Sequence, residues 1–437
     1  MIRRTSPIVL SPLKIFSDPV HGFISVPRRL ILDLIQTPEV QRLRRIRQLG
    51  VGYLVFPGAE HTRFGHALGA MALMQDVLAV LQEKGTPVTP EEHTAALAAA
   101  LLHDIGHGPF SHTLEHELIS GFHHEKMSRV LLCRLNERFG GALDRALAMF
   151  DDAYERPFFH QLISSQLDMD RLDYLRRDSF YTGVVEGRVG VERIIKTMCV
   201  HPAEGGPEAR IVIEAKGTYA VENFLIARRL MYWQVYLHKT VLAGDHLLRA
   251  ILARVRGHLE AGTGGGGTTA APAFLFFLKN RLDARDLDRP DVRDAYTSLD
   301  DTDVLFSIKQ WQTSDDPVLA DLARRFINRD FFRVTFLERP PTEAQTERWR
   351  GQVADWLVAT GRSEAAHAEA DTAFYLGFDA SRHAAYDEAE AGSIRVIDRH
   401  GDVRELSRTT DTAAVTALTR FEEKPYVCYP KAVELRR

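Results

Sequence analysis

Histidine and aspartate side chains in the first 180 residues have the types and spacing needed to hold a metal ion. His103 and Asp104 are adjacent, His66 lies upstream, and Asp170 lies downstream in an aspartate-rich segment. Imidazole and carboxylate together suit Mn, Fe, Ni or Zn, and Mg can serve at high concentration. Four such ligands on a six-coordinate metal leave room for water and a phosphate oxygen. The chemistry this predicts is metal-assisted phosphate hydrolysis.

More histidines follow the His-Asp pair. His107 lies one helical turn beyond His103, His112 follows a Gly-Pro turn, and His124 begins the next predicted helix. Imidazoles beside a metal suit a polyanionic substrate, as phosphate ligands or as a general acid. Taken singly, each of them fits a structural role equally well. Three others are interpreted as surface or structural residues: His61, His93 and His116.

One predicted helix combines several functional side chains. Asp170, Tyr174 and Asp178 recur every four residues and therefore share one helix face, with Arg171 at its edge. Such a face could contact metal, phosphates and a sugar hydroxyl in turn, although an exposed helix stabilised by its own pairs is the alternative. Arg63, three residues before His66, would add a guanidinium for bidentate phosphate contact.

Helices are the elements that must position these residues. Apolar residues recur at helical spacing over much of 28–255. Thr89 and Pro90 are typical of an N-cap and a first helical position, and their helix should run to Asp104 and stop at the glycines that follow. We expect helices over 63–84, 89–104, 124–139, 142–150, 158–178, 219–239, 240–260 and 342–359, and strands over 22–26, 210–214 and 426–429, with a hairpin over 394–406.

The composition is that of a globular protein without an overall basic field. Hydrophobic residues make up 45%, charged residues 26%, and the net charge is -4. The three cysteines show no metal-binding spacing, and we expect a reducing, cytoplasmic location. We predict no signal peptide and no membrane-spanning run. Three regions are expected: a catalytic helical domain at 1–260, a Gly-rich loop or linker at 261–273, and a helical continuation with an α+β lobe at 274–437.

These segments resemble the HD superfamily of metal phosphohydrolases, and most closely its deoxynucleoside triphosphate triphosphohydrolases. The likeness is dense over residues 14–240 and thin after 270. It implies a mainly α fold, with an HD-domain helical core and a smaller α+β C-terminal lobe. The segments that carry it are 18–22, 37–44, 48–50, 56–59, Arg63–His66, His103–His112, Asp168–Tyr174 and Tyr236–Lys239.

The resemblance implies hydrolysis of a deoxynucleoside triphosphate to deoxynucleoside and intact triphosphate. His124 would act as the general acid, and His107 and Asp104 would belong to the catalytic group. Gln48 and Asp178 would hold the sugar 3′-hydroxyl, while Leu49 and Tyr236 would crowd the 2′ position. Metal ligands would be His66, His103, Asp104 and Asp170; phosphate contacts would be Arg63, His107, His112, Arg171, Tyr174 and Arg228.

The resemblance also implies a homo-oligomer, from dimer to tetramer, and an activating nucleotide bound between subunits. Lys14, Arg44 and Arg329 match residues that would grip such an activator. Glu214 departs from the pattern, because it stands where an activator-binding arginine is expected. The activator is therefore altered, or its site is absent.

Two alternatives remain open. One is an HD phosphatase or phosphodiesterase acting on another nucleotide. The other is a nucleic-acid-binding protein with a vestigial HD site, whose direct support is the basic helix at 42–47. The competing interpretation of that helix is a solvated basic face composed of Arg42, Arg44, Arg45 and Arg47.

Overall fold

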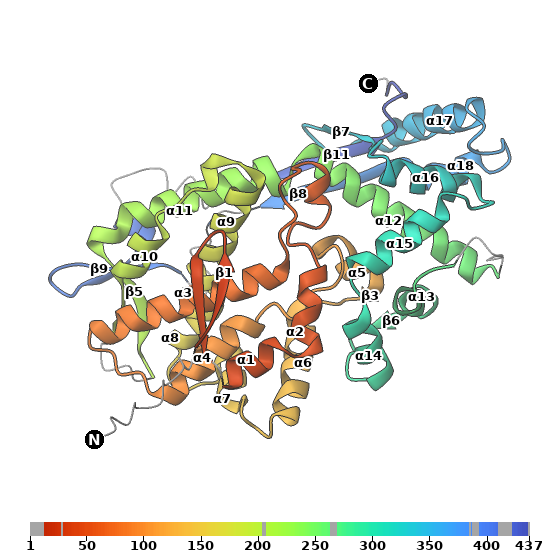
Figure 1. Ribbon diagram of the computed structural model, residues 1–437. Coiled ribbons are helices and arrows are strands. Elements are labelled where there is room, and N and C mark those ends of the chain that lie inside the picture. Colours follow the sequence, from red (N-terminus) through yellow and green to blue (C-terminus); the bar gives the residue numbers. More distant parts are fainter. Residues whose placement is uncertain are drawn as a thin grey trace, which may run out of the picture.

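The computed structural model describes residues 13–27, 29–202, 207–262, 269–383, 386, 393–409 and 422–435. The fold is mainly α with small sheets, as the sequence predicts (Figure 1). The α-helices are α1 Leu30–Ile35, α2 Pro38–Arg42, α3 Arg63–Glu83, α4 Pro90–Leu102, α5 His112–Leu118, α6 His124–Arg138, α7 Asp144–Phe150, α8 Phe158–Ile163, α9 Met169–Thr182, α10 Val191–Thr197, α11 Thr218–Met231, α12 Lys239–Glu260, α13 Pro272–Lys279, α14 Pro290–Ser298, α15 Asp301–Trp311, α16 Pro317–Ile327, α17 Glu343–Ala359 and α18 Ala368–Asp371.

Helices α3, α4 and α9 form the centre of the N-terminal half. Helix α3 packs against both of the others and is buried along most of its length. It is also long and apolar enough to cross a membrane, but 67% of its most apolar window is buried inside the fold. Its composition is thus that of a core helix. Thr89 caps α4 through a capping box with Glu92, which confirms the predicted start of that helix.

The strands among the described residues form four small sheets. Their orders are β1-β2, β10-β9-β5-β4, β7-β11-β8 and β3-β6. The strands are β1 Leu13–Asp18, β2 Gly22–Pro27, β3 Ile119–Ser120, β4 Met198–His201, β5 Arg210–Glu214, β6 Leu282–Asp283, β7 Arg333–Phe336, β8 Gly377–His383, β9 Arg395–Ile397, β10 Val403–Glu405 and β11 Glu422–Tyr429.

The predicted hairpin near residue 400 is confirmed, since β9 and β10 pair antiparallel. Strand β9 also lies parallel to β5, so this hairpin extends a sheet begun in the first half of the chain. Helix α12 runs from the N-terminal region into the C-terminal lobe, where it packs against α16 and β7 (Figure 1). The predicted division at 261–273 is not tested by these contacts and stays a prediction; residues 263–268 lie outside the described residues.

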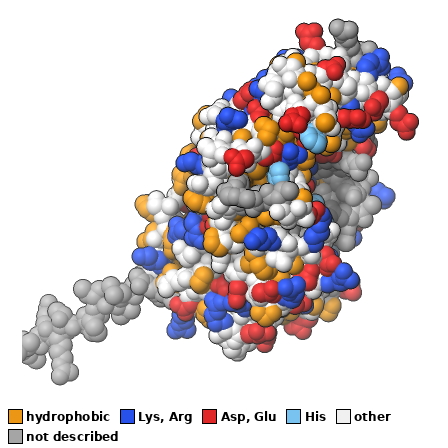
Figure 2. Space-filling view, turned by 90° about the vertical axis from the view of Figure 1, so that its right-hand side faces the viewer, with side chains coloured by type: hydrophobic (Ala, Val, Ile, Leu, Met, Phe, Trp, Pro, Cys, Tyr) orange, Lys and Arg blue, Asp and Glu red, His pale blue; other side chains and the backbone are white. Residues whose placement is uncertain are grey.

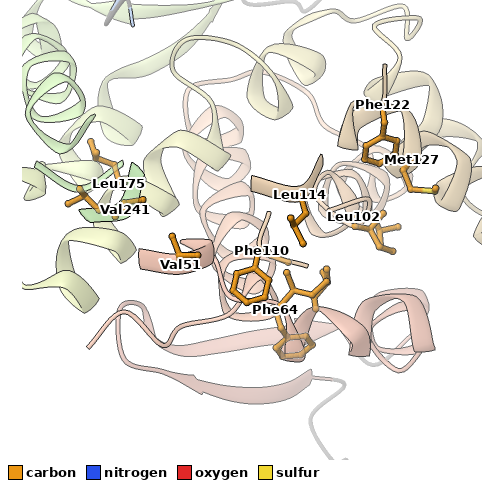
Figure 3. Packing of buried hydrophobic residues seen from close by; sticks show 14 of the residues in the cluster. Val51, Phe64, Leu102, Phe110, Leu114, Phe122, Met127, Leu175 and Val241 are labelled. Carbon is orange, nitrogen blue, oxygen red and sulfur yellow. The ribbon is translucent and has the colours of Figure 1, made fainter. Parts of the chain in front are cut away.

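One hydrophobic cluster extends through the described residues. Figure 3 shows Phe64, Phe110 and Leu114 in this cluster together with Val51 and Val241. These residues come from α3, the loop after the His-Asp pair, α5, a short 3₁₀ helix and α12. Phe110 is buried in this cluster, so the loop that carries His107 is anchored in the core.

Two helix predictions were wrong in their extent. The interval 158–178 holds two helices, because α8 ends at Ile163 and Asp168 begins α9 as its N-cap by accepting the Arg171 N–H. The interval 219–239 is interrupted at Met231, where a π-helical turn, Tyr232–Tyr236, follows α11. Such turns recur at functional sites, and this one positions Tyr236.

Candidate metal centre and active site

The four predicted metal ligands converge. One side-chain atom from each of His66, His103, Asp104 and Asp170 lies within 4.8 Å of the others. Asp170 Oδ1 is 3.0 Å from His66 Nε2 and 3.5 Å from His103 Nε2. The ligands come from α3, the end of α4 and the first turn of α9. The N-terminal end of α9 carries a partial positive charge that favours the Asp170 carboxylate there.

The two imidazoles are held with Nε2 free for a metal. His66 Nδ1 bonds to Asp173 Oδ2 at 2.7 Å, and His103 Nδ1 bonds to the Ala100 carbonyl at 2.7 Å. Both Nε2 atoms are buried without a hydrogen-bond partner in the part of the chain that the structure describes. Metal-ligating histidines in proteins almost always engage their second nitrogen in this way. The residues present therefore fit a divalent metal.

The electrostatics of the centre suit a cation. Burial lowers the pKa of His66, but the adjacent carboxylates of Asp170 and Asp173 outweigh burial and raise that pKa to about 10. Burial also lowers the pKa of His103, but the neighbouring carboxylates of Asp104 and Asp170 outweigh burial and raise that pKa to about 9. Although burial alone would raise it, the pKa of Asp104 lies well below its usual value because His107, His103 and Arg63 surround it. Without metal the carboxylates are ionised, and protons occupy the imidazoles.

A second layer of charged groups fixes His66. Asp173 accepts hydrogen bonds from Arg177, which also binds Asp18 on the β1-β2 hairpin. His21 Nε2 lies 2.6 Å from Asp173 Oδ1, whereas His66 contacts Oδ2. Gly69 makes room for this network, because a Cβ there would lie 1.9 Å from Asp173 Oδ1.

Two side chains from distant parts of the sequence hold the loop after the His-Asp pair through hydrogen bonds. Arg42 donates to the carbonyls of Ile105, His107 and Leu299, and Tyr296 donates to the Gly106 carbonyl. Arg42 is completely buried, and burial lowers its pKa. The interpretation of Arg42 as part of a solvated basic face was therefore wrong; Arg44 and Arg45 are exposed, as expected.

The end of this loop is strained. Phe110 and Ser111 have φ angles of 53° and 50°, which are uncommon for residues with a Cβ. Asp301 stabilises the conformation by accepting the Phe110 N–H at 2.9 Å. Strain of this kind concentrates at functional sites.

Glu115 organises the three histidines beyond the metal centre. Its Oε1 accepts the backbone N–H of His124 and lies 2.9 Å from His124 Nδ1, while Oε2 lies 2.8 Å from His112 Nδ1. Burial alone would raise the pKa of Glu115, but the hydrogen bonds from His112 and His124 lower it strongly. The His107 and His124 rings stack with centroids 3.7 Å apart. Burial, followed by the charge of Arg63, lowers the pKa of His107 and keeps that ring neutral.

A cavity of about 390 Å³ opens beside these groups. Arg63 lies on its wall and binds Asp104 at 2.5 Å and Ser111 at 3.0 Å. Among the described residues, Arg171 Nη1, Gln48 Oε1 and His107 Nε2 are buried without a partner, as expected for groups awaiting a polar ligand. The predicted substrate residues that line the cavity are Gln48, Leu49, Arg63, His107, His112, Arg171, Tyr174, Asp178, Arg228 and Tyr236, and His124 lines it as well.

Both carboxylate oxygens of Asp178, which lines this cavity, are held by neighbouring side chains. Tyr236 donates to its Oδ2 at 2.8 Å, and His61 Nε2 lies 2.7 Å from its Oδ1. His61 is buried and stacks on Tyr181, so it has a structural role in holding Asp178. Burial, followed by the negative charge of Asp178, raises the pKa of Tyr236 and keeps its hydroxyl protonated.

The three residues predicted to bind an activator lie outside the cavity. Lys14, Arg44 and Arg329 are exposed. Arg44 stacks over the Phe64 ring at 3.6 Å, and Arg329 donates to the Leu54 carbonyl. Glu214 pairs with Lys216 at 2.7 Å and Lys84 at 3.4 Å, so its charge is balanced within the chain. The role of these residues stays a prediction.

Sequence reasoning missed several residues of the site. Glu115, Asp173 and Tyr296 are not among the predicted site residues, although each contacts the loop or a histidine directly. The signal for Asp173 was available, because it lies one turn after Asp170 on the predicted helix. Tyr296 gave no such signal, since its contact spans the two halves of the chain.

Comparison with known proteins agrees with this geometry. A family model described as the HD domain matches residues 63–178, and one described as an HD-associated region matches 189–260. An uncharacterized protein of Bacillus subtilis (strain 168), YwfO, is 36% identical over 97% of this chain and 93% of its own length. The crystal structure of a phosphohydrolase from Bacteroides thetaiotaomicron VPI-5482 has a TM-score of 0.88 at 41% identity, covering 95% of this chain and 99% of that one.

A more distant relative carries a specific activity in its name. The deoxynucleoside triphosphate triphosphohydrolase SAMHD1 of Homo sapiens is 29% identical over 77% of this chain, which spans 56% of that protein. The ranges matched by the two family models contain all four metal-ligand candidates as well as Arg228 and Tyr236. The chain belongs to the HD-domain phosphohydrolase family.

Proposed function

We propose that this protein hydrolyses deoxynucleoside triphosphates to deoxynucleoside and inorganic triphosphate. The observation that carries the proposal is a single cavity lined by Arg63, Arg171 and Arg228, which opens onto Asp104 and Asp170. Three guanidiniums suit the charge of a triphosphate better than that of a monophosphate. The name of the SAMHD1 relative supports the same reaction.

A divalent metal at His66, His103, Asp104 and Asp170 would supply Lewis-acid polarisation of a phosphate oxygen. Mn, Fe, Ni, Zn and Mg are all candidates. The protein's own contribution is orientation and proton transfer. Arg63 is fixed by Asp104 and Ser111 at the wall of the cavity, where it would bind the α-phosphate. Charge stabilisation of this kind is usually the largest catalytic term.

His124 would protonate the leaving 5′-oxygen. Water adds to the α-phosphorus and releases one proton to the solvent, the bond from phosphorus to the 5′-oxygen breaks, and a proton from His124 Nε2 moves to that oxygen. Glu115 holds Nδ1 at 2.9 Å, which orients the ring for this transfer. His107 stacks on His124 and, being neutral, would donate its one N–H to a phosphate oxygen.

The sugar would lie against Gln48, Leu49, Asp178 and Tyr236. Asp178 accepts hydrogen bonds and would hold the 3′-hydroxyl together with Gln48. Tyr236 is fixed by its bond to Asp178, so it cannot easily move away from an added 2′-hydroxyl. A rigid wall at this point would favour deoxyribose over ribose.

An activator and an oligomer belong to the same proposal. Lys14, Arg44 and Arg329 are exposed cations outside the cavity, suited to a nucleotide bound between subunits. Figure 2 shows acidic and basic side chains mixed over the face in view, in keeping with a protein whose net charge is -4. Among its described residues, this face presents no continuous basic patch of the kind that binds nucleic-acid phosphates (Figure 2).

The test uses purified protein with Mn and the four deoxynucleoside triphosphates, singly and mixed, and resolves the products by ion-exchange chromatography. His103→Ala is the control. Deoxynucleoside and intact triphosphate, absent with the variant, support the proposal, and turnover restricted to mixtures supports an activator. Monophosphate with pyrophosphate would assign the protein to another HD reaction. Nucleic-acid binding without turnover would overturn the proposal.

A further inference from the structure

Part of the cavity has no role in the proposed reaction. Once the metal ligands and the groups for phosphates and sugar are set aside, the remaining wall is mostly apolar, with one further carboxylate. That carboxylate belongs to Asp245 on α12, and Thr113 on α5 lies next to it. A base attached to the sugar needs such a wall, because its faces are apolar and its edge carries donors and acceptors. The wall comprises Gly50, Gly52, Phe110, Ser111, Thr113, Tyr232, Val235, Val241 and Asp245.

Asp245 is placed to use its carboxylate inside the cavity. Val241 precedes it by one helical turn, so both side chains lie on the same face of α12. That face packs against α5 and against the 3₁₀ helix Gly50–Leu54. Glycines at 50 and 52 leave the neighbouring backbone without side chains. Gly50 needs its positive φ of 51°, and a Cβ there would lie 2.9 Å from the Phe110 carbonyl oxygen.

Thr113 fixes the Asp245 carboxylate but uses one of its oxygens. The threonine hydroxyl donates to Oδ1 at 2.6 Å. Across the described ranges, Asp245 has no salt bridge within 4.0 Å, and Oδ2 receives no side-chain hydrogen bond. Burial raises the pKa of Asp245 to about 6, so the group is ionised at pH 8. A half-buried carboxylate with one donor gains from a second donor supplied by a ligand.

We infer that Asp245, held by Thr113, determines base specificity by accepting a hydrogen bond from an exocyclic amino group of the substrate base. This inference rests on the proposed function. A carboxylate accepts and does not donate, so it fits the N4 amino group of cytosine. The O4 carbonyl of uracil at the same place would be repelled. The cavity therefore favours amino-bearing bases over uracil and thymine.

The test compares dCTP with dUTP at pH 8, because these substrates differ at the edge that Asp245 would contact. The wild-type protein should show kcat/KM at least about tenfold higher for dCTP. Asp245→Asn should bring the two values within about threefold or reverse them, since an amide can donate to O4. Thr113→Val, which removes the hydroxyl at nearly constant volume, should lower the ratio in part. Glu260→Gln, at the exposed end of the same helix, is the control and should keep the wild-type ratio.

Each other outcome has a distinct meaning. Equal losses on both substrates in Asp245→Asn would make Asp245 structural and overturn the inference. A wild-type protein that treats dCTP and dUTP alike overturns it even if the variants fail to fold. Hydrolysis of neither substrate, nor of dATP, dGTP or dTTP, would instead count against the proposed function.

Discussion

Asp173 Oδ2 lies 2.7 Å from Nδ1 of His66, and this contact turns the opposite nitrogen of the ring toward Asp170. Asp173 is itself held by Arg177 and is completely buried. The metal centre therefore depends on Asp173, a carboxylate that contacts His66 at Nδ1 and not at Nε2, the nitrogen that would bind the metal. The consequences can be measured separately from catalysis.

Replacing Asp173 should weaken metal binding. Asp173→Asn keeps the shape but removes the charge that orients His66, and loss of such a partner typically costs about 10–100-fold in metal affinity. The measurement is a competition titration of Mn or Zn into the apoprotein. Glu192→Gln is the control, because Glu192 forms an exposed pair with Arg176 on a neighbouring surface. Unchanged affinity in Asp173→Asn would refute the orienting role.

Metal binding should release protons and strengthen as pH rises. The pKa values of His66 and His103 are raised to about 10 and about 9 in the metal-free protein, so both rings hold protons at pH 7. A metal binds neutral imidazole, and protons therefore compete with it. Affinity should increase from pH 7 toward pH 9 and level off above pH 10. Calorimetry in buffers of different ionisation enthalpy measures the release, and a pH-independent affinity would contradict these protonation states.

Glu115→Gln should reduce kcat more than it raises KM. The change replaces the carboxylate that holds His124 Nδ1 and the His124 backbone N–H, and it also alters the contact to His112 Nδ1. A misoriented general acid typically costs about 100-fold in rate. Steady-state kinetics test this, with Glu125→Gln as the control because Glu125 is exposed beside His124. A loss confined to KM would mean that Glu115 serves substrate binding instead.

Arg42→Met should destabilise the fold. The change leaves three buried carbonyls without their donor, which should lower the free energy of unfolding by about 2–4 kcal/mol. Arg45→Met, which removes a half-exposed partner of Asp300, should cost less than about 1 kcal/mol. Denaturant unfolding of both variants gives the comparison. Equal effects would show that the loop does not depend on Arg42.

Local patterns in the sequence were enough for much of the site. The helix face with Asp170, Tyr174 and Asp178 follows from spacing alone, and all three line one cavity. The start of α4 follows from Thr89 and Pro90, whose capping chemistry acts within one turn.

Contacts between distant segments could not be predicted in the same way. Arg42 belongs to a run of arginines, and nothing local shows that this one is buried against the Leu299 carbonyl. The parallel pairing of β9 with β5 joins strands from the two halves of the chain. The break before α9 depends on the Asp168 cap, which overrides an otherwise continuous helical pattern.

Hydrolysis in water enriched in heavy oxygen tests the proposed reaction most directly. The protein would be incubated with Mn and dCTP, and both products would be analysed by mass spectrometry. Attack on the α-phosphorus with loss of the 5′-oxygen predicts one heavy oxygen in inorganic triphosphate and none in the deoxynucleoside. Heavy oxygen in a nucleoside monophosphate, or in the 5′-hydroxyl of the deoxynucleoside, would contradict the mechanism.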